Sequence, residues 1–158
     1  MSKITPFLWF ENQAEEAANL YASIFKNAIV GQVARYPEGS PLPAGTAMTV
    51  EFELDGQPFI ALNGGPYYKF NEAVSFVIDC TTQEEVDYYW SKLTADGGEE
   101  GQCGWLKDKF GLSWQVTPKA LKDLLGARDP KKAQAAMHAM LQMRKIDIAA
   151  LQKAHDEA

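Results

Sequence analysis

The sequence has few of the residues and patterns on which several classes of protein depend. Its 158 residues include two cysteines and two histidines, and no apolar run approaches the roughly 20 residues that cross a bilayer. Fifteen Lys and Arg stand against 21 Asp and Glu, a net charge of −6, whereas phosphate-binding proteins need clustered basic side chains. We therefore expect neither a membrane protein nor a nucleic-acid-binding protein.

The N-terminal residues and the cysteines point to the cytoplasm. The stretch MSKITPFLWFEN is hydrophobic only over a short run and lacks the cleavage site of a signal peptide. Cys80 and Cys103 are isolated, without CxxC spacing. A disulfide between them is the alternative, but we expect two reduced, half-buried thiols in a cytoplasmic chain.

The first part of the chain carries strand and helix patterns in a clear order. Residues 4–10 are apolar on both faces, as in a central strand, and Asn12 is the expected N-cap of a helix with Glu15 at N3. The strand at 47–56 alternates strictly between apolar and polar residues, and Asp55-Gly56 is a hairpin signal. Two further strands are expected at 28–37 and 57–63.

The same order returns in the second part. Residues 73–80 predict a strand, Thr82 caps a helix with Glu85 at N3, and strand material continues to Val116. The two expected caps lie 70 positions apart (82 − 12). The sequence thus predicts an internal duplication, β-α-β-β-β twice, with module one at about 3–65 and module two at about 73–118.

Beyond Pro118 the composition changes to that of a helical extension, residues 119–158. We expect a short helix ended by Gly126, a second that begins at Asp129-Pro130, and a third from Asp147. The second carries a methionine-rich stripe, for which we expect docking on residues 1–118, the duplicated domain, or on a partner subunit.

Several long motifs resemble one known family. The motifs are NQAEEAANLYASIF, LNGGPYYKFNEAVSF, TQEEVDYYWSKL, CGWLKDKFGLSWQVTP and, in the tail, AMHAMLQMRKIDIAALQKA. Paired βαβββ modules resemble the vicinal oxygen chelate superfamily, which includes glyoxalase I, bleomycin-resistance proteins and extradiol dioxygenases. The motifs are similar to its PhnB-like branch, whose sequences are often labelled 3-demethylubiquinone-9 3-methyltransferase-like. The resemblance implies an α+β fold with a half-barrel cavity between the modules, and a homodimer.

The methyltransferase label has little support in the residues. An adenosylmethionine site of the common type needs a glycine-rich turn that leads from a strand directly into a helix. The only glycine cluster after a strand is Gly64-Gly65, and Pro66 with two tyrosines follows it. We therefore expect no methyl transfer.

Superfamily enzymes hold a divalent metal with His and Glu side chains on the central strands. Both histidines of this chain, His138 and His155, lie in the helical extension. The corresponding strand positions carry Pro6 to Trp9, Ala73 and Ser75, Asn63, and Gln115 instead. We expect no His/Glu metal centre and no cofactor. An alternative stays open, an all-carboxylate Mg²⁺ or Mn²⁺ site that uses Glu51, Glu53 or Glu72.

Strand alternation and the resemblance together select candidate ligand contacts. They are aromatic, amide, hydroxyl and carboxylate side chains expected on the cavity side, a mixture typical of small-molecule pockets. The candidates are Trp9, Glu51, Asn63, Ser75, Trp105 and Gln115. Cys103 has no strand histidine to activate it, and Asp108 is expected to form a turn, so no catalytic residue is assigned.

The function expected from these observations is the binding of a small organic ligand in the half-barrel, without a His/Glu metal centre. Two alternatives stay open. One is a divalent-metal-dependent lyase, isomerase or dioxygenase with carboxylate ligands, and the other is a non-catalytic scaffold whose cavity is vestigial.

Overall fold

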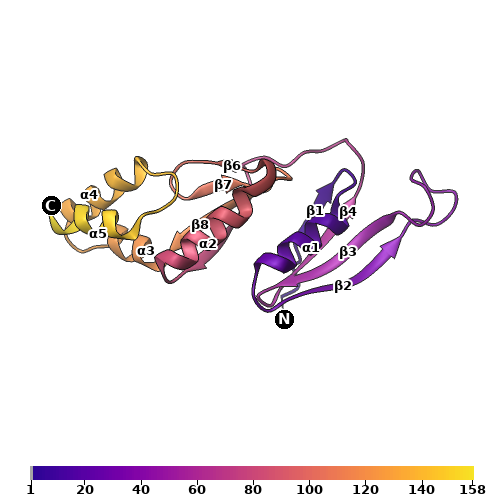
Figure 1. Cartoon of the computed structure of the whole chain (residues 1–158), viewed down its shortest axis with the longest axis horizontal. Coiled ribbons are helices and arrows are strands. Elements are labelled where there is room, and N and C mark those ends of the chain that lie inside the picture. Colours follow the sequence, from indigo (N-terminus) through magenta and orange to yellow (C-terminus); the bar gives the residue numbers. More distant parts are fainter. Residues whose placement is uncertain (1) are drawn as a thin grey trace. The chain divides into compact units, whose positions relative to one another are not determined.

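The computed structural model describes residues 2–158. They divide into two compact units, and the boundary in the sequence falls between Phe70 and Asn71. Each unit contains a four-stranded mixed sheet and a long helix packed on one of its faces (Figure 1). The elements of the first unit are β1 (Phe7–Phe10), α1 (Ala14–Ile24), β2 (Ala28–Arg35), β3 (Ala47–Leu54) and β4 (Gln57–Asn63).

The second unit repeats this order and then adds three helices. A short 3₁₀ turn at Ala95–Gly97 follows its first helix. The other elements are β5 (Ser75–Cys80), α2 (Gln83–Thr94), β6 (Glu99–Glu100), β7 (Trp105–Lys107), β8 (Ser113–Pro118), α3 (Lys119–Leu125), α4 (Pro130–Leu141) and α5 (Ile148–Asp156).

The two sheets share one topology. Their strand orders are β1-β4-β3-β2 and β5-β8-β7-β6, with β1 parallel to β4, β5 parallel to β8, and the remaining pairs antiparallel. The predicted α+β fold with two βαβββ modules is confirmed. Gly64-Gly65 leads into no helix, because the next helix begins at Gln83, so the arrangement of an adenosylmethionine-binding turn is absent from the described residues.

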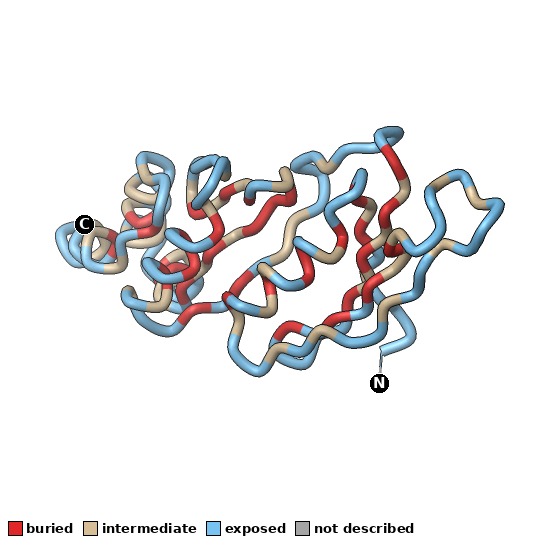
Figure 2. Tube along the Cα trace, turned by 45° about the vertical axis from the view of Figure 1, so that its right-hand side comes forward, coloured by how far each residue is buried: buried red, intermediate tan, exposed pale blue. Residues whose placement is uncertain are grey.

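Strand alternation decides which face of each sheet is covered. Along β3, Val50, Phe52 and Leu54 are buried, while Glu51 and Glu53 are exposed, as predicted. Figure 2 shows buried stretches within the strands and helices and exposed residues along the connecting loops. The face opposite each helix, here called the open face, therefore carries the polar members of the strands.

Local signals set the turns and one of the two caps. Asp55 and Gly56 have φ values of 50° and 80°, the positive angles that a two-residue type I′ hairpin turn requires. The cap of α2 is as predicted, since the hydroxyl of Thr82 accepts from the N–H of Glu85 at 3.1 Å. The cap of α1 is not: the helix begins at Ala14, and Asn12 does not cap it.

The C-terminal helices pack into one apolar cluster within the second unit. Its buried members are Leu121, Leu124, Ala136, Ile146 and Leu151. Of the predicted stripe on α4, Met137 and Leu141 are about half exposed. No helix within residues 2–158 combines the length and the apolar character needed to span a bilayer.

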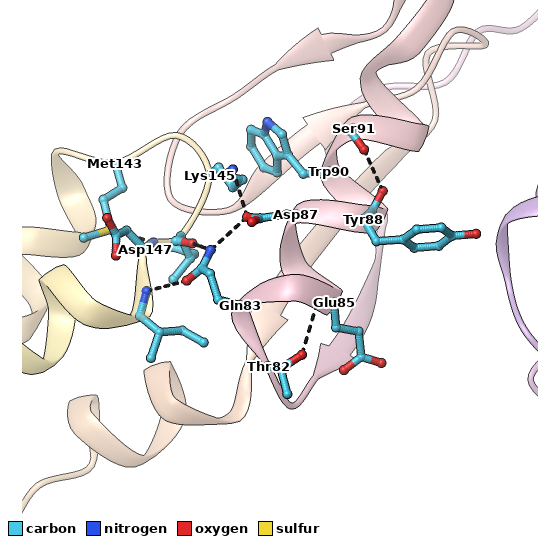
Figure 3. Close-up of polar contacts among 12 residues, drawn as sticks. Thr82, Gln83, Glu85, Asp87, Tyr88, Trp90, Ser91, Met143, Lys145 and Asp147 are labelled. Atoms are coloured by element: carbon cyan, nitrogen blue, oxygen red, sulfur yellow. Dashed lines mark hydrogen bonds and ion pairs between the residues drawn. The ribbon is translucent and has the colours of Figure 1, made fainter.

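Gln83, the first residue of α2, links that helix by hydrogen bonds to the segment that leads into α5. Its side-chain amide donates to the carbonyl of Ile146 (2.9 Å) and to the carboxylate of Asp87 (3.0 Å), and it accepts from the N–H of Ile148 (2.8 Å). Asp87 also forms an ion pair with Lys145 at 2.8 Å. Figure 3 shows Gln83 placed between Asp87 on its own helix and the segment around Asp147.

The same tail segment supports the loop before β7. The N–H groups of Cys103 and Gly104 donate to the carbonyls of Met143 and Arg144, both at 2.8 Å. A Cβ atom on Gly104 would lie 3.1 Å from the side chain of Ile146, and its φ of 84° also favours glycine. The helical extension thus holds the residues that lead directly into β7.

Candidate functional site

Three of the predicted ligand contacts come together on the open face of the second sheet. In the strand register Gln115 lies opposite Val77 on one side and Trp105 on the other. Its amide nitrogen donates to the hydroxyl of Ser75 at 2.9 Å. Ser75, Trp105 and Gln115 are all partly exposed, so a ligand on this face can reach them.

A small hollow of about 100 Å³ adjoins these residues. Its lining includes Trp105, Lys107, Ser113, Glu72 and Glu99. Ser113 is only 1% exposed, and within residues 2–158 its hydroxyl has no hydrogen-bond partner. A buried hydroxyl without a partner costs about 1–3 kcal/mol, a cost that a ligand group or water paired with it would remove.

The rim of this hollow is charged. Lys107 forms an ion pair with Glu72, and the hydrogen bond from the Lys107 ammonium holds the pKa of the Glu72 carboxyl below its usual value. The same bond, followed by the charges of Glu72 and Glu99, raises the pKa of Lys107. Glu99 stands opposite Lys107 in the β6–β7 register. One ammonium therefore lies near two carboxylates and pairs with only one of them, Glu72.

Two predicted contacts lie on the open face of the first sheet. Glu51 is exposed and lines a hollow of about 690 Å³, together with the apolar side chains of Ile29 and Ile60. Trp9 is half-buried on β1, and its indole N–H donates to the carbonyl of Gly65 at 2.9 Å. A Cβ atom on Gly64 would lie 2.4 Å from the Trp9 ring, so the linker after β4 passes directly over this tryptophan.

Asn63 differs from the other candidates because it lies on the face of the first sheet that α1 covers. It shares that face with Phe59 and Ala61, and it is 3% exposed. Its amide oxygen accepts from the N–H of Ala14 at 2.8 Å, and its amide nitrogen donates to the carbonyl of Ala47 at 3.0 Å. Asn63 therefore supplies the polar contact at the start of α1 that was expected from Asn12.

The donor groups of each module do not fit the His/Glu metal centre that the superfamily implies. The histidines lie on α4 and α5, and among the described residues no group of three His, Cys, Asp or Glu side chains could hold a metal ion. Of the carboxylates that stayed open as an alternative, Glu72 is paired with Lys107, while Glu51 and Glu53 are exposed. Amide and hydroxyl oxygens are weak ligands for zinc and other transition metals.

The cysteines are free thiols in different surroundings. Cys80 is buried on β5, and burial, followed by the charges of Glu85 and Asp79, raises its pKa to about 12. Cys103 is half-buried with a φ of 58°, at the loop that the tail supports. The raised pKa keeps Cys80 protonated and inert at neutral pH.

Sequence reasoning did not single out Ser113, Lys107 or Glu99. The alternation that selected Gln115 also placed Ser113 on its face, but a strand serine there is ordinarily solvated. The pairing of Lys107 with Glu72 had no local signal, because Glu72 lies in the linker before β5. If the two-residue strand β6 had been recognised in the sequence, its pairing with β7 would have placed Glu99 opposite Lys107.

The paired βαβββ sheets have the fold of the vicinal oxygen chelate superfamily. The family model described as 3-demethylubiquinone-9 3-methyltransferase matches residues 2–117, and the chain belongs to that family. The PhnB protein from Bacillus cereus is 36% identical, with a TM-score of 0.68 over 74% of this chain and 99% of that chain. The predicted PhnB-like branch is thereby confirmed.

Two further solved structures share the fold. Protein PA1353 from Pseudomonas aeruginosa is 19% identical, with a TM-score of 0.62 over 75% of this chain and 98% of that one. The fosfomycin resistance protein FosX from Listeria monocytogenes is 18% identical, with a TM-score of 0.58 over 80% and 98% of the two chains. No match to a curated protein was found.

Proposed function

We propose that the protein binds a small organic ligand on the open face of module two, with Trp105, Ser75 and Gln115 as the principal contacts. The observation that carries the proposal is the buried, unpartnered hydroxyl of Ser113 in a hollow beside them. A ligand group that pairs with this hydroxyl removes its desolvation cost only in the bound state. An aromatic wall with a few convergent polar groups is the usual composition of such a site.

Trp9 and Glu51 are proposed as contacts on the open face of module one. Asn63 is proposed as a structural support, since both ends of its amide already pair with backbone groups. The shared half-barrel of the two modules, the homodimer and the cytoplasmic location stay predictions.

The proposal includes no His/Glu metal centre and no methyl transfer. It is supported by the donor set of each open face, which offers hydroxyl, amide, indole and separate carboxylate groups but no histidine, and by the absence of a helix directly after Gly64-Gly65 within the described residues. The fold alone does not assign a reaction, because one fold hosts many activities.

Two measurements on protein purified without chelator test the proposal. Elemental analysis is expected to show divalent metal well below one ion per chain. A stoichiometric, tightly held ion would contradict the proposal and favour the metal-dependent lyase, isomerase or dioxygenase.

Thermal unfolding with a diverse set of metabolites tests the binding itself. A ligand at 100 times its Kd stabilises the native state by about 2.7 kcal/mol, which raises the melting temperature by several degrees. The increase should shrink in Gln115→Ala and persist in Gln102→Ala, a control in an exposed loop. A set in which no compound changes the melting temperature would favour the scaffold alternative.

A further inference from the structure

The hollow beside Trp105 has a rim with a net negative charge, and the hydroxyl at its bottom has no hydrogen-bond partner within residues 2–158. Three glutamates line the hollow: Glu72 is paired with Lys107, Glu100 is paired with Arg144, and Glu99 has no ion-pair partner within residues 2–158. At the bottom Ser113 is 1% exposed, and its hydroxyl has no partner within residues 2–158. At this hollow the chain therefore leaves one negative charge without an ion-pair partner and one hydroxyl without a hydrogen-bond partner.

Neighbouring basic groups are already used elsewhere. Arg144 lies 3.7 Å from the carboxylate of Glu100, which also accepts from the indole N–H of Trp90 at 2.8 Å. Glu100 also lines the hollow, and its carboxylate pairs with α2 and with the helical extension. Within residues 2–158 Arg144 forms no ion pair with Glu72 or Glu99, so it does not cancel the charge of Glu99.

We propose that the hollow receives the ammonium end of a small organic amine, placed between Glu99, the hydroxyl of Ser113 and the indole ring of Trp105. This inference rests on the proposed function and names the chemical class of the ligand for the same open face. An alkylammonium has three N–H donors, which suit a carboxylate and a hydroxyl that both accept.

Charge and ring chemistry both favour a cation over an anion. A carboxylate or phosphonate group would meet three glutamates and a lysine already engaged with one of them, so it would be repelled by the net charge of the rim. The face of an indole ring attracts ammonium groups through the negative charge of its π-system, and more strongly when they are desolvated. A volume of about 100 Å³ admits the end of an alkyl chain, not a whole cofactor.

The probes are butylammonium chloride, sodium butyrate and 1-butanol, which share an alkyl chain and differ in charge. Each is added to the full-length protein at equal ionic strength, and the indole N–H resonances of the four tryptophans are followed by NMR. Butylammonium is expected to shift the Trp105 resonance saturably, while butyrate and butanol shift it little.

Three variants assign the interaction. Glu99→Gln is expected to weaken butylammonium binding about two- to fivefold, the range for one exposed ion pair. Ser113→Ala is expected to weaken it about two- to tenfold, the range for one hydrogen bond, and to raise the melting temperature without ligand because the unpaired hydroxyl is gone. Glu84→Gln, an equal change of charge at an exposed position on α2, should leave binding unchanged.

Saturable binding of butyrate in preference to butylammonium would overturn the inference, as would the absence of any Trp105 shift with butylammonium. Full affinity in both Glu99→Gln and Ser113→Ala would also overturn it. These outcomes are separate from the proposed function, which survives if an anionic or neutral metabolite raises the melting temperature through Gln115.

Discussion

The buried carboxylate of Asp108 holds the β7–β8 hairpin, and its replacement by asparagine should destabilise the protein strongly. Asp108 is 3% exposed. One carboxylate oxygen accepts from the N–H groups of Phe110 (2.9 Å) and Leu112 (3.1 Å), and the other accepts from the indole N–H of Trp114 (2.9 Å). The turn expected at Asp108 is therefore present, and the residue also anchors a core tryptophan.

The magnitude follows from which bonds asparagine can keep. In Asp108→Asn the remaining oxygen can still accept from the two backbone N–H groups, but the new amide nitrogen faces the indole N–H, donor against donor. Hydrogen bonds to charged groups contribute about 1.5–3 kcal/mol each, and an unsatisfied buried donor adds its desolvation cost. We expect the free energy of unfolding to fall by about 2–4 kcal/mol.

The assay is urea unfolding followed by circular dichroism at one protein concentration, with the free energy taken by linear extrapolation. Asp123→Asn, an exposed aspartate on α3, should change stability by less than about 0.5 kcal/mol. In a Trp114→Phe background, which lacks the indole N–H, Asp108→Asn should cost at least about 1 kcal/mol less. A loss below about 0.5 kcal/mol, or strict additivity in this cycle, would refute the reasoning.

Two further predictions concern the tail and the thiols. Gln83→Ala should lower the free energy of unfolding by about 1–3 kcal/mol, because it leaves two backbone groups of the helical extension without partners. The control Gln134→Ala, on the exposed side of α4, should change the free energy of unfolding by less than about 0.5 kcal/mol. Equal values for the two variants would contradict this account. At pH 8 a thiol with a pKa of about 12 is ionised in about one molecule in 10,000, so iodoacetamide should modify Cys103 before Cys80, as followed by peptide mass spectrometry. Equal rates in the native protein would contradict the burial of Cys80.

Local sequence patterns predicted the modules because their signals are short-range. The alternation along β3, the Asp55-Gly56 turn and the Thr82 cap each depend on residues within a few positions of one another. The duplication then followed from the repeated order of these signals. The start of α1 could not be predicted in this way, because its polar partner, Asn63, is 49 positions away from Ala14.

The candidate site was predictable only in part, for a related reason. Alternation placed Ser75, Trp105 and Gln115 on one face, and the structure brings them together. Asn63 was expected on the cavity side but lies on the face covered by α1, because alternation does not show which side of β4 is covered. The burial of Ser113 depends on neighbouring strands and on the linker, none of which is adjacent to it in sequence.

The hydrogen bonds between the helical extension and the loop before β7 mean that residues well beyond the last strand help to fix the position of Trp105. The N–H groups of Cys103 and Gly104 need acceptors, and this chain takes them from Met143 and Arg144. A shorter chain that ended at Pro118 would have to hydrate those two groups or find other acceptors, and its aromatic wall would be free to shift. The family match ends at residue 117, so relatives with different C-terminal sequences can share every strand and still present different pockets.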